Sequence, residues 1–209
     1  VEKRLQSNDI SKMMGELNKE SSIQALGSKT GVDASILPKL AVVAIPLILR
    51  ALSKNAESKA GKDSLSDALE KHKGQTKDVS SIEDVFKKVD TDDGDKILDH
   101  AFGDKDKVVD QIAAQTGISK SEVAKVLASM APMMLCMLAD KKDADGLDAD
   151  GVAKQTDIFS KQAEETATSN FDITDLFPKQ SGTTTPSATG GLGGILGSIL
   201  GNLFWSKTK

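Results

Sequence analysis

The strongest feature of the hydrophobic pattern is an apolar stretch that runs from Leu40 to Leu52 and is interrupted only by Arg50. Up to Arg50 every helical face of this stretch is apolar, and a helix that is apolar all round belongs inside a fold. The stretch is also too short to cross a bilayer, which takes about 20 apolar residues. It therefore predicts a buried central helix over residues 34–55, capped at its start by Asp33.

Shorter amphipathic segments predict further helices, separated by polar and glycine-containing turns. Helices are expected over residues 10–17, from residue 21 to Gly31, and over residues 64–74 and 81–89. The acidic run 90–95 is expected to end the last of these, and residues 97–103 are expected to form a short apolar turn closed by glycine. After the second acidic run, a helix is expected to extend to residue 166.

The pattern of the first part returns after residue 104. An offset of 86 residues aligns Thr30-Gly31 with Thr116-Gly117 and also aligns Pro46 with Pro132. Over residues 30–54, seven of the 25 aligned positions are identical, whereas composition alone would give about one or two. We infer an internal duplication of two helix-turn-long-helix units, residues 7–55 and 94–142, whose long helices pack together.

The predicted fold class is all-α: a multihelical orthogonal array around a buried hydrophobic central helix, with an internal helix-turn-helix-like duplication. One helical domain is expected over residues 1–175, which is long enough to bury a core without disulfides or metal ions. Aliphatic residues, Ala and Met must fill that core, because the chain has six Phe, one Trp and no Tyr.

The C-terminal part differs in composition from the rest of the chain. Residues 176–190 are predicted to be a flexible linker, and residues 191–209 a Gly/Leu-rich apolar tail. An isolated helix of this tail would be unstable in water, because each Gly costs about 1 kcal/mol relative to Ala. We therefore expect the tail to bind the domain's own groove, another copy of the chain, or a membrane surface. The partner-binding residues expected there are Leu192, Ile195, Leu196, Ile199, Leu200, Leu203, Phe204 and Trp205.

Net charge and cysteine content narrow the functional classes. The formal net charge of −4 argues against binding to a nucleic-acid backbone, which needs a basic surface. The single cysteine, Cys136, lies in an apolar segment and is expected to be a buried hydrophobic residue. A chain with one cysteine fits a reducing compartment, so a cytoplasmic location is expected.

Two acidic runs, residues 90–95 and 143–151, are only partly similar to calcium-binding loops. Such a loop needs a bidentate Glu at position 12. Counted from Asp90 that position is Ala101, and counted from Asp143 it is Lys154. Both runs are therefore predicted to be solvated helix-capping turns.

The two histidines, His72 and His100, show no spacing typical of a catalytic triad or a metal site. Asp99 precedes His100, but adjacent residues on a helix do not face each other. We therefore expect no metal, no cofactor, no small-molecule substrate and no enzymatic activity.

Residues 109–127 consist of two predicted helices joined by the Thr116-Gly117 turn, which is typical of a helix-turn-helix. The second helix offers Lys120 and Lys125 but no Arg, and it continues directly into an apolar stretch. Simple helix packing is the favoured interpretation, and DNA association is the alternative.

Several short segments resemble the bacterial YidB-like family of domains of unknown function. They are Gly94-Asp-Lys-Ile-Leu98-Asp-His100-Ala-Phe102-Gly103, the Thr116-Gly117 turn, the Ala131-Pro132 helix and the Gly/Leu-rich end. The resemblance covers roughly residues 5–160 and the tail. It implies an all-α array around a hydrophobic central helix, and it brings no established catalytic residues.

These observations predict a non-enzymatic bacterial protein that self-associates or binds another protein, through the tail and the groove between the central helices. Two alternatives remain open: a DNA-associated protein that uses residues 109–127, and a peripheral membrane protein that uses residues 192–205.

Overall fold

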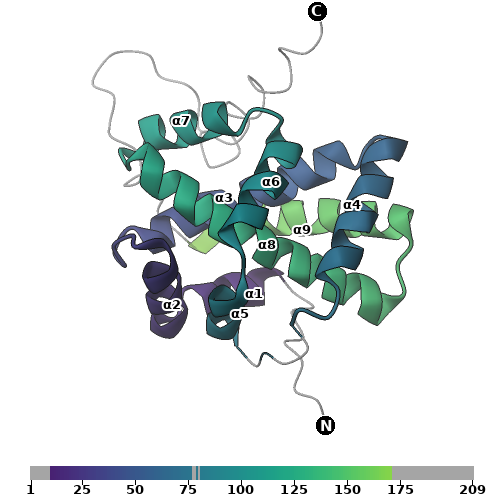
Figure 1. The fold of residues 1–209 in the computed structure, drawn as a ribbon, viewed down its shortest axis with the longest axis horizontal. Helices are drawn as coiled ribbons and strands as arrows, with labels where there is room; N and C mark the ends of the chain where they lie inside the picture. The colour runs from purple at the N-terminus through teal and green to yellow at the C-terminus, as the bar shows by residue number, and fades with distance from the viewer. Residues whose placement is uncertain (1–9, 77–78, 80, 171–209) are drawn as a thin grey trace, which may run out of the picture.

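The computed structural model describes residues 10–76, 79 and 81–170, and these residues form helices and connecting turns but no strands (Figure 1). The predicted all-α class is therefore confirmed. The linker 176–190 and the tail 191–209 lie outside the described residues. In chain order the helices are α1 (Ile10–Leu17), α2 (Glu20–Thr30), α3 (Leu37–Asn55), α4 (Lys59–His72), α5 (Ile82–Lys88), α6 (Thr91–Phe102), α7 (Lys105–Thr116), α8 (Lys120–Asp145) and α9 (Ala149–Asn170).

Two long helices, α3 and α8, form the centre of the molecule. Every residue from Leu40 to Leu49 in α3 is buried, as is every residue from Val126 to Cys136 in α8. The two helices contact each other, and α8 also packs against α2, α4, α5, α6, α7 and α9. The predicted central helix is thus confirmed, and it shares the centre of the fold with the long helix of the second unit.

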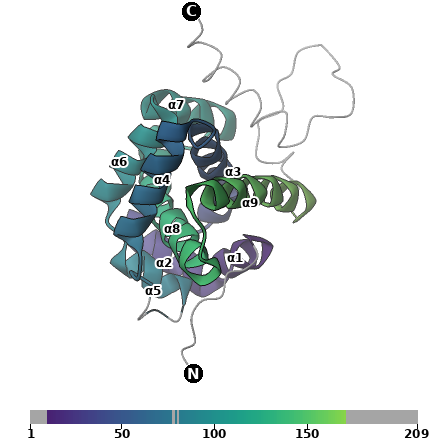
Figure 2. The same ribbon diagram turned by 90° about the vertical axis from the view of Figure 1, so that its right-hand side faces the viewer.

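Helices α6 and α9 cover opposite sides of this central pair. α6 lies along α8 and α9 lies along α3, and Figure 2 shows α6 and α9 on opposite sides of the molecule. α9 runs antiparallel to α3, because Ser53 Oγ lies 3.4 Å from Asp157 Oδ1 whereas Arg50 Nη1 lies 3.3 Å from Glu164 Oε1. Later residues of α9 therefore face earlier residues of α3.

The two turns that define the duplication have the same geometry. Thr30 and Thr116 each donate a side-chain hydrogen bond to the carbonyl oxygen four residues earlier, at 2.8 and 2.7 Å. Gly31 and Gly117 then end α2 and α7 with φ angles of 69° and 72°, a left-handed conformation that glycine adopts without strain. The 86-residue offset is thus repeated in the backbone, which supports the duplication.

The two long helices begin differently. Ser119 caps α8 and exchanges hydrogen bonds with Glu122, which forms a complete capping box. In the first unit Ile36 stands in the place of Glu122, so no carboxylate can complete the box. Asp33 accepts from Ser35 N at 2.8 Å in a turn instead, and α3 begins at residue 37. The prediction that Asp33 caps a helix over residues 34–55 was therefore wrong by one turn.

The acidic run 90–95 is part of a helix. Asp90 caps α6 by accepting a hydrogen bond at 2.9 Å from the backbone N–H two residues later. α6 then continues to Gly103, which ends it with a φ angle of 69°. The acidic run, which was expected to form a capping turn, and the expected short turn 97–103 thus belong to one helix, and only Asp90 acts as a cap. In the second acidic run Gly146 ends α8 and Asp148 accepts from Gly151 N at 2.8 Å, as predicted for a helix-capping turn.

Candidate binding cleft

A cleft of about 410 Å³ opens between α4 and α6, at the C-terminal end of α3. Its apolar floor comes from all four helices α3, α4, α6 and α8, and its rim is polar. We call it the α4–α6 cleft. It is lined by Leu52, Asn55, Gly61, Ser64, Leu65, Asp67, Ala68, Lys71, His72, Asp93, Lys96, Ile97, His100 and Leu135.

Helical spacing explains which side chains line the cleft. Leu65, Ala68 and His72 follow one another at intervals of three and four residues, so they share one face of α4. Ile97 and His100 share a face of α6 for the same reason. The cleft is therefore formed where these two faces meet over α3 and α8.

His72 joins three helices at one end of the cleft. Its side chain is only 8% exposed, and its Nε2 lies 3.3 Å from Asp93 Oδ2 on α6. Its Nδ1 lies 3.3 Å from Gln75 Oε1, which also accepts from Cys136 Sγ on α8 at 3.4 Å. Both ring nitrogens thus face acceptor oxygens, and His72 links α4 to α6 directly and to α8 through Gln75.

The Cys136 thiol at the end of this chain of contacts is buried. Desolvation, followed by the nearby carboxylates of Asp140 and Asp93, raises the pKa of Cys136 to about 12. The expectation of a buried hydrophobic cysteine is thus confirmed, and the thiolate, which is the nucleophilic form, is disfavoured.

The rim of the α4–α6 cleft carries both signs of charge, from Lys71 and Lys96 and from Asp67 and Asp93. Lys71, Lys96 and His100 are exposed, and within the described residues neither lysine forms an ion pair. Asn55 fixes the end of α6 by donating to the carbonyl of Ala101 at 2.6 Å. The apolar floor can bind apolar side chains, and the two lysines can attract carboxylates. The cleft is therefore suited to a ligand that carries both apolar groups and carboxylates.

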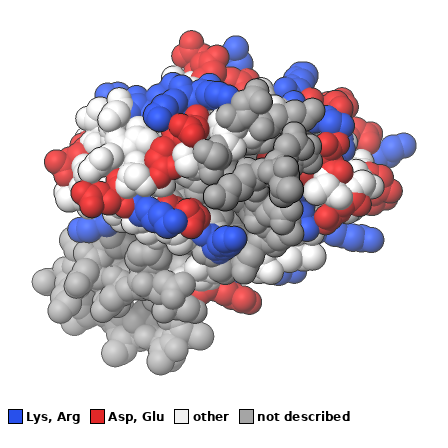
Figure 3. Space-filling model, turned by 90° about the horizontal axis from the view of Figure 1, so that it is seen from below, with Lys and Arg blue, Asp and Glu red and all other residues white. Residues whose placement is uncertain are grey.

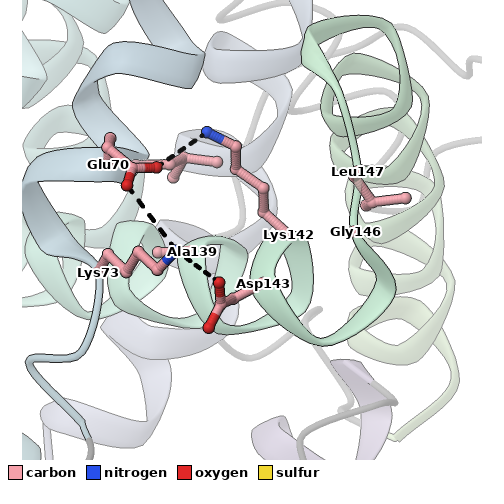
Figure 4. A pocket seen from close by; sticks show the side chains of 8 residues that line it. Glu70, Lys73, Ala139, Lys142, Asp143, Gly146 and Leu147 are labelled. Atoms are coloured by element: carbon pink, nitrogen blue, oxygen red, sulfur yellow. Dashed lines mark hydrogen bonds and ion pairs between the residues drawn. The ribbon is translucent and has the colours of Figure 1, made fainter.

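A second, smaller pocket of about 200 Å³ lies between the ends of α4 and α8 (Figure 4). Its charged side chains neutralise one another. Lys73 Nζ lies 2.6 Å from Asp143 Oδ1, and Lys142 Nζ lies 3.3 Å from Glu70 Oε2 and 3.0 Å from Ser66 Oγ. This pocket is therefore a clamp between the two helices rather than a free binding site.

The helix-turn-helix residues lie on the outside of the first turns of α8. Lys120 pairs with Asp110 of α7 at 2.8 Å, and Lys125 is exposed. From Val126 to Cys136 α8 is buried by other helices, so the predicted recognition helix is accessible only in its first turns. On the face shown in Figure 3 the described basic and acidic side chains are interspersed.

The predicted site residues of the tail, from Leu192 to Trp205, lie outside the described residues. The sequence did not predict the cleft. His72 lies in the expected helix 64–74, and His100 lies in the expected short turn 97–103. Helical spacing of Asp93, Ile97 and His100 was the available signal, but residues 90–95 were expected to form a helix-capping turn and not part of a helix.

By length and composition α8 is the one described helix that could cross a membrane. However, 78% of its apolar window is buried inside the protein. This burial is typical of the central helix of a packed domain.

The described chain is thus an all-α domain built around a duplicated helix-turn-long-helix unit, with a cleft beside its central pair of helices. It belongs to a family of bacterial proteins of unknown function (DUF937), whose model matches residues 11–142. YidB is a member of that family, so the family suspected from the short segments is confirmed. The match includes α1 to α7 and most of α8 but not α9. Comparison with curated proteins and with solved structures finds no significant match.

Proposed function

We propose that the protein is a non-enzymatic protein-interaction module that self-associates, with the α4–α6 cleft as its docking site. The observation that carries this proposal is the combination of an apolar floor with Lys71 and Lys96, which form no ion pair with described residues. Burial of apolar surface is worth about 25 cal/mol per Å², so the floor favours an inserted side chain. The lysines then select a segment that also carries carboxylates.

The chemistry of the described residues supports a binding role over a catalytic one. His72 is engaged with Asp93 and Gln75, and the Cys136 thiol is buried with a raised pKa. Nucleophilic catalysis needs an activated nucleophile beside a base. Neither of these side chains has that setting.

The tail 191–209 is a second binding element in this proposal. Its expected contact residues, Leu192 to Trp205, are large and apolar, and the glycines among them disfavour an isolated helix, so we expect this stretch to need a partner. Full-chain mass measurements on Leu196→Asp/Leu200→Asp separate the contribution of the tail from that of the cleft.

Membrane attachment through the tail and DNA association through residues 109–127 stay predictions. Co-sedimentation with anionic phospholipid vesicles tests the first, and a gel shift over a range of salt concentrations tests the second. A cytoplasmic location also stays a prediction.

Light scattering on the full chain, over a range of protein concentrations, tests the proposed function. Ala68 lines the cleft, so Ala68→Trp fills it, and Lys96→Glu reverses one of the rim charges at an exposed position. Ala114→Trp adds the same indole on an exposed position of α7 and is the matched control.

We expect a concentration-dependent mass above that of the monomer for the wild type and for Ala114→Trp. The mass of Ala68→Trp and Lys96→Glu should fall toward the monomer. The proposal is wrong if the wild type is monomeric at every concentration, or if both cleft variants, folded by circular dichroism, keep the wild-type mass.

A further inference from the structure

We propose that residues 171–177 of a second copy of this chain occupy the α4–α6 cleft, an inference that rests on the proposed self-association. This segment directly follows α9 and reads Phe-Asp-Ile-Thr-Asp-Leu-Phe. It combines four large apolar residues with two carboxylates. An apolar floor suits the apolar side chains, and the two rim lysines suit the carboxylates.

The charges favour this segment over the apolar tail. Asp172 and Asp175 are the acidic residues of the segment, and they complement Lys71 and Lys96 on the cleft rim. The tail 191–209 carries Lys207 and Lys209 as its only charged side chains, so it offers no carboxylate side chain to Lys71 or Lys96. A cleft of about 410 Å³ has the size of a site for a few side chains rather than for a whole helix.

The position of α9 shows why the segment should come from another copy. Arg50 and Ser53 of α3 contact α9, whereas Leu52 and Asn55 of α3 line the cleft. At about 100° per residue these two pairs point to opposite faces of α3. The segment therefore leaves α9 on the side of α3 that faces away from the cleft.

The reach of the chain supports the same conclusion. Glu164 lies beside Arg50, and α9 runs on for six residues to Asn170, about 9 Å further from the cleft end of α3. The cleft lies near Asn55, about 7 Å from Arg50 in the opposite direction along α3. To reach the cleft, the chain must also cross α3, which is about 10 Å wide. The five residues from Asn170 to Asp175 span at most about 17 Å when fully extended. The segment of a second copy is not limited by this distance. If each of two copies places its segment in the cleft of the other, the result is a closed dimer.

Carbodiimide cross-linking of the full chain tests this inference, because the reagent joins a lysine to a carboxylate only when they touch. A mixture of isotopically light and heavy protein is cross-linked and analysed by mass spectrometry. We expect links from Lys71 and Lys96 to Asp172 and Asp175 in peptides of mixed isotope composition. Lys12, exposed on α1, is the matched control and should give none.

Three results would overturn the inference. Links of a single isotope composition place the segment in the cleft of its own chain. Links from Asp67 on the rim to Lys207 or Lys209 make the tail the occupant. Links to Lys12 at equal yield show no preference for the cleft.

Charge reversal gives an independent readout and separates this inference from the proposed function. Asp172→Lys/Asp175→Lys should weaken self-association about 10-fold, since two exposed ion pairs are worth about 1 to 2 kcal/mol together. Adding Lys71→Glu/Lys96→Glu should restore it. If Ala68→Trp dissociates the protein but Asp172→Lys/Asp175→Lys does not, the segment is not the occupant and the cleft proposal stands. If neither does, both proposals fail.

Discussion

Gly94 sets how closely α6 can approach α8, and its replacement by Ala is the sharpest test of the fold. A Cβ at this position would lie 1.7 Å from the carbonyl oxygen of Ala128 and 2.7 Å from its carbonyl carbon. Both atoms belong to the backbone of α8, so no side-chain rotation relieves the clash. The two helices would have to separate by about 1.5 Å to restore ordinary contact, and even smaller gaps forfeit a large part of the dispersion attraction.

The size of the destabilisation depends on the core contacts that are lost when α6 and α8 separate. Leu98 and Phe102 on α6 are 0% and 5% exposed, and both would lose contacts in the core. Overpacking usually costs about 1–3 kcal/mol, and Ala regains about 1 kcal/mol over Gly in a helix. Because the clash is between backbones, we expect the upper end of that cost, which leaves a net loss of about 2 kcal/mol. With a urea m-value of about 2 kcal/mol/M, the unfolding midpoint falls by about 1 M.

Urea unfolding followed by circular dichroism at 222 nm measures this change. Gly15→Ala is the matched control, because Gly15 also lies in a helix but a Cβ there meets nothing within 4 Å. That variant should be more stable than the wild type by about 0.5–1 kcal/mol. The reasoning is refuted if Gly94→Ala is as stable as the wild type, or if the two variants shift the midpoint in the same direction.

Three further predictions concern single side chains. Hydrogen bonds from Ser21 and Ser81 lower the pKa of Glu83 from 4.5 to about 2. The stabilisation of the folded state by these hydrogen bonds is therefore present above pH 4.5 and is lost as the pH falls toward 2. Ser21→Ala should lower the free energy of unfolding by about 1 kcal/mol at pH 7, after allowance for solvent screening. Unfolding curves at pH 2 should show no difference from the wild type. The Cys136 thiol should react with a disulfide reagent at pH 8 only after denaturation, and rapid reaction of the native protein would contradict its burial. Lys142→Met removes the bonds to Ser66 and Glu70 and should lower the free energy of unfolding by about 1–2 kcal/mol, whereas an unchanged urea midpoint would mean that the clamp contributes nothing.

The segment that carries the family resemblance, residues 94–103, is the main part of α6. Gly94 permits the close crossing with α8, and Gly103 ends the helix in a left-handed conformation. Ala101 and Phe102 are buried in the core. His100 is exposed at the cleft and has no packing role of this kind. Packing and capping thus account for most of the segment but not for His100, which lines the cleft.

The sequence by itself determined the features that depend on nearby residues. Apolar runs in α3 and α8 dictate burial, since such helices are unfavourable at a surface. The Thr-Gly pairs at 30–31 and 116–117 dictate where α2 and α7 end, because the side-chain bond and the left-handed glycine are local. The all-α class followed from these patterns, whereas the family was indicated by the resemblance of short segments such as residues 94–103.

Only the tertiary structure decided the features that join distant segments. Asp90 to Asp95 read as a loop because Asp and Gly favour turns, but a cap at Asp90 and packing on α8 make it helical. The position of Gly94 against Ala128 and the contact of His72 with Asp93 depend on how α4, α6 and α8 cross. Local periodicity states which face of a helix is apolar but not which other helix covers it, so the cleft became visible only when the helices were placed in space.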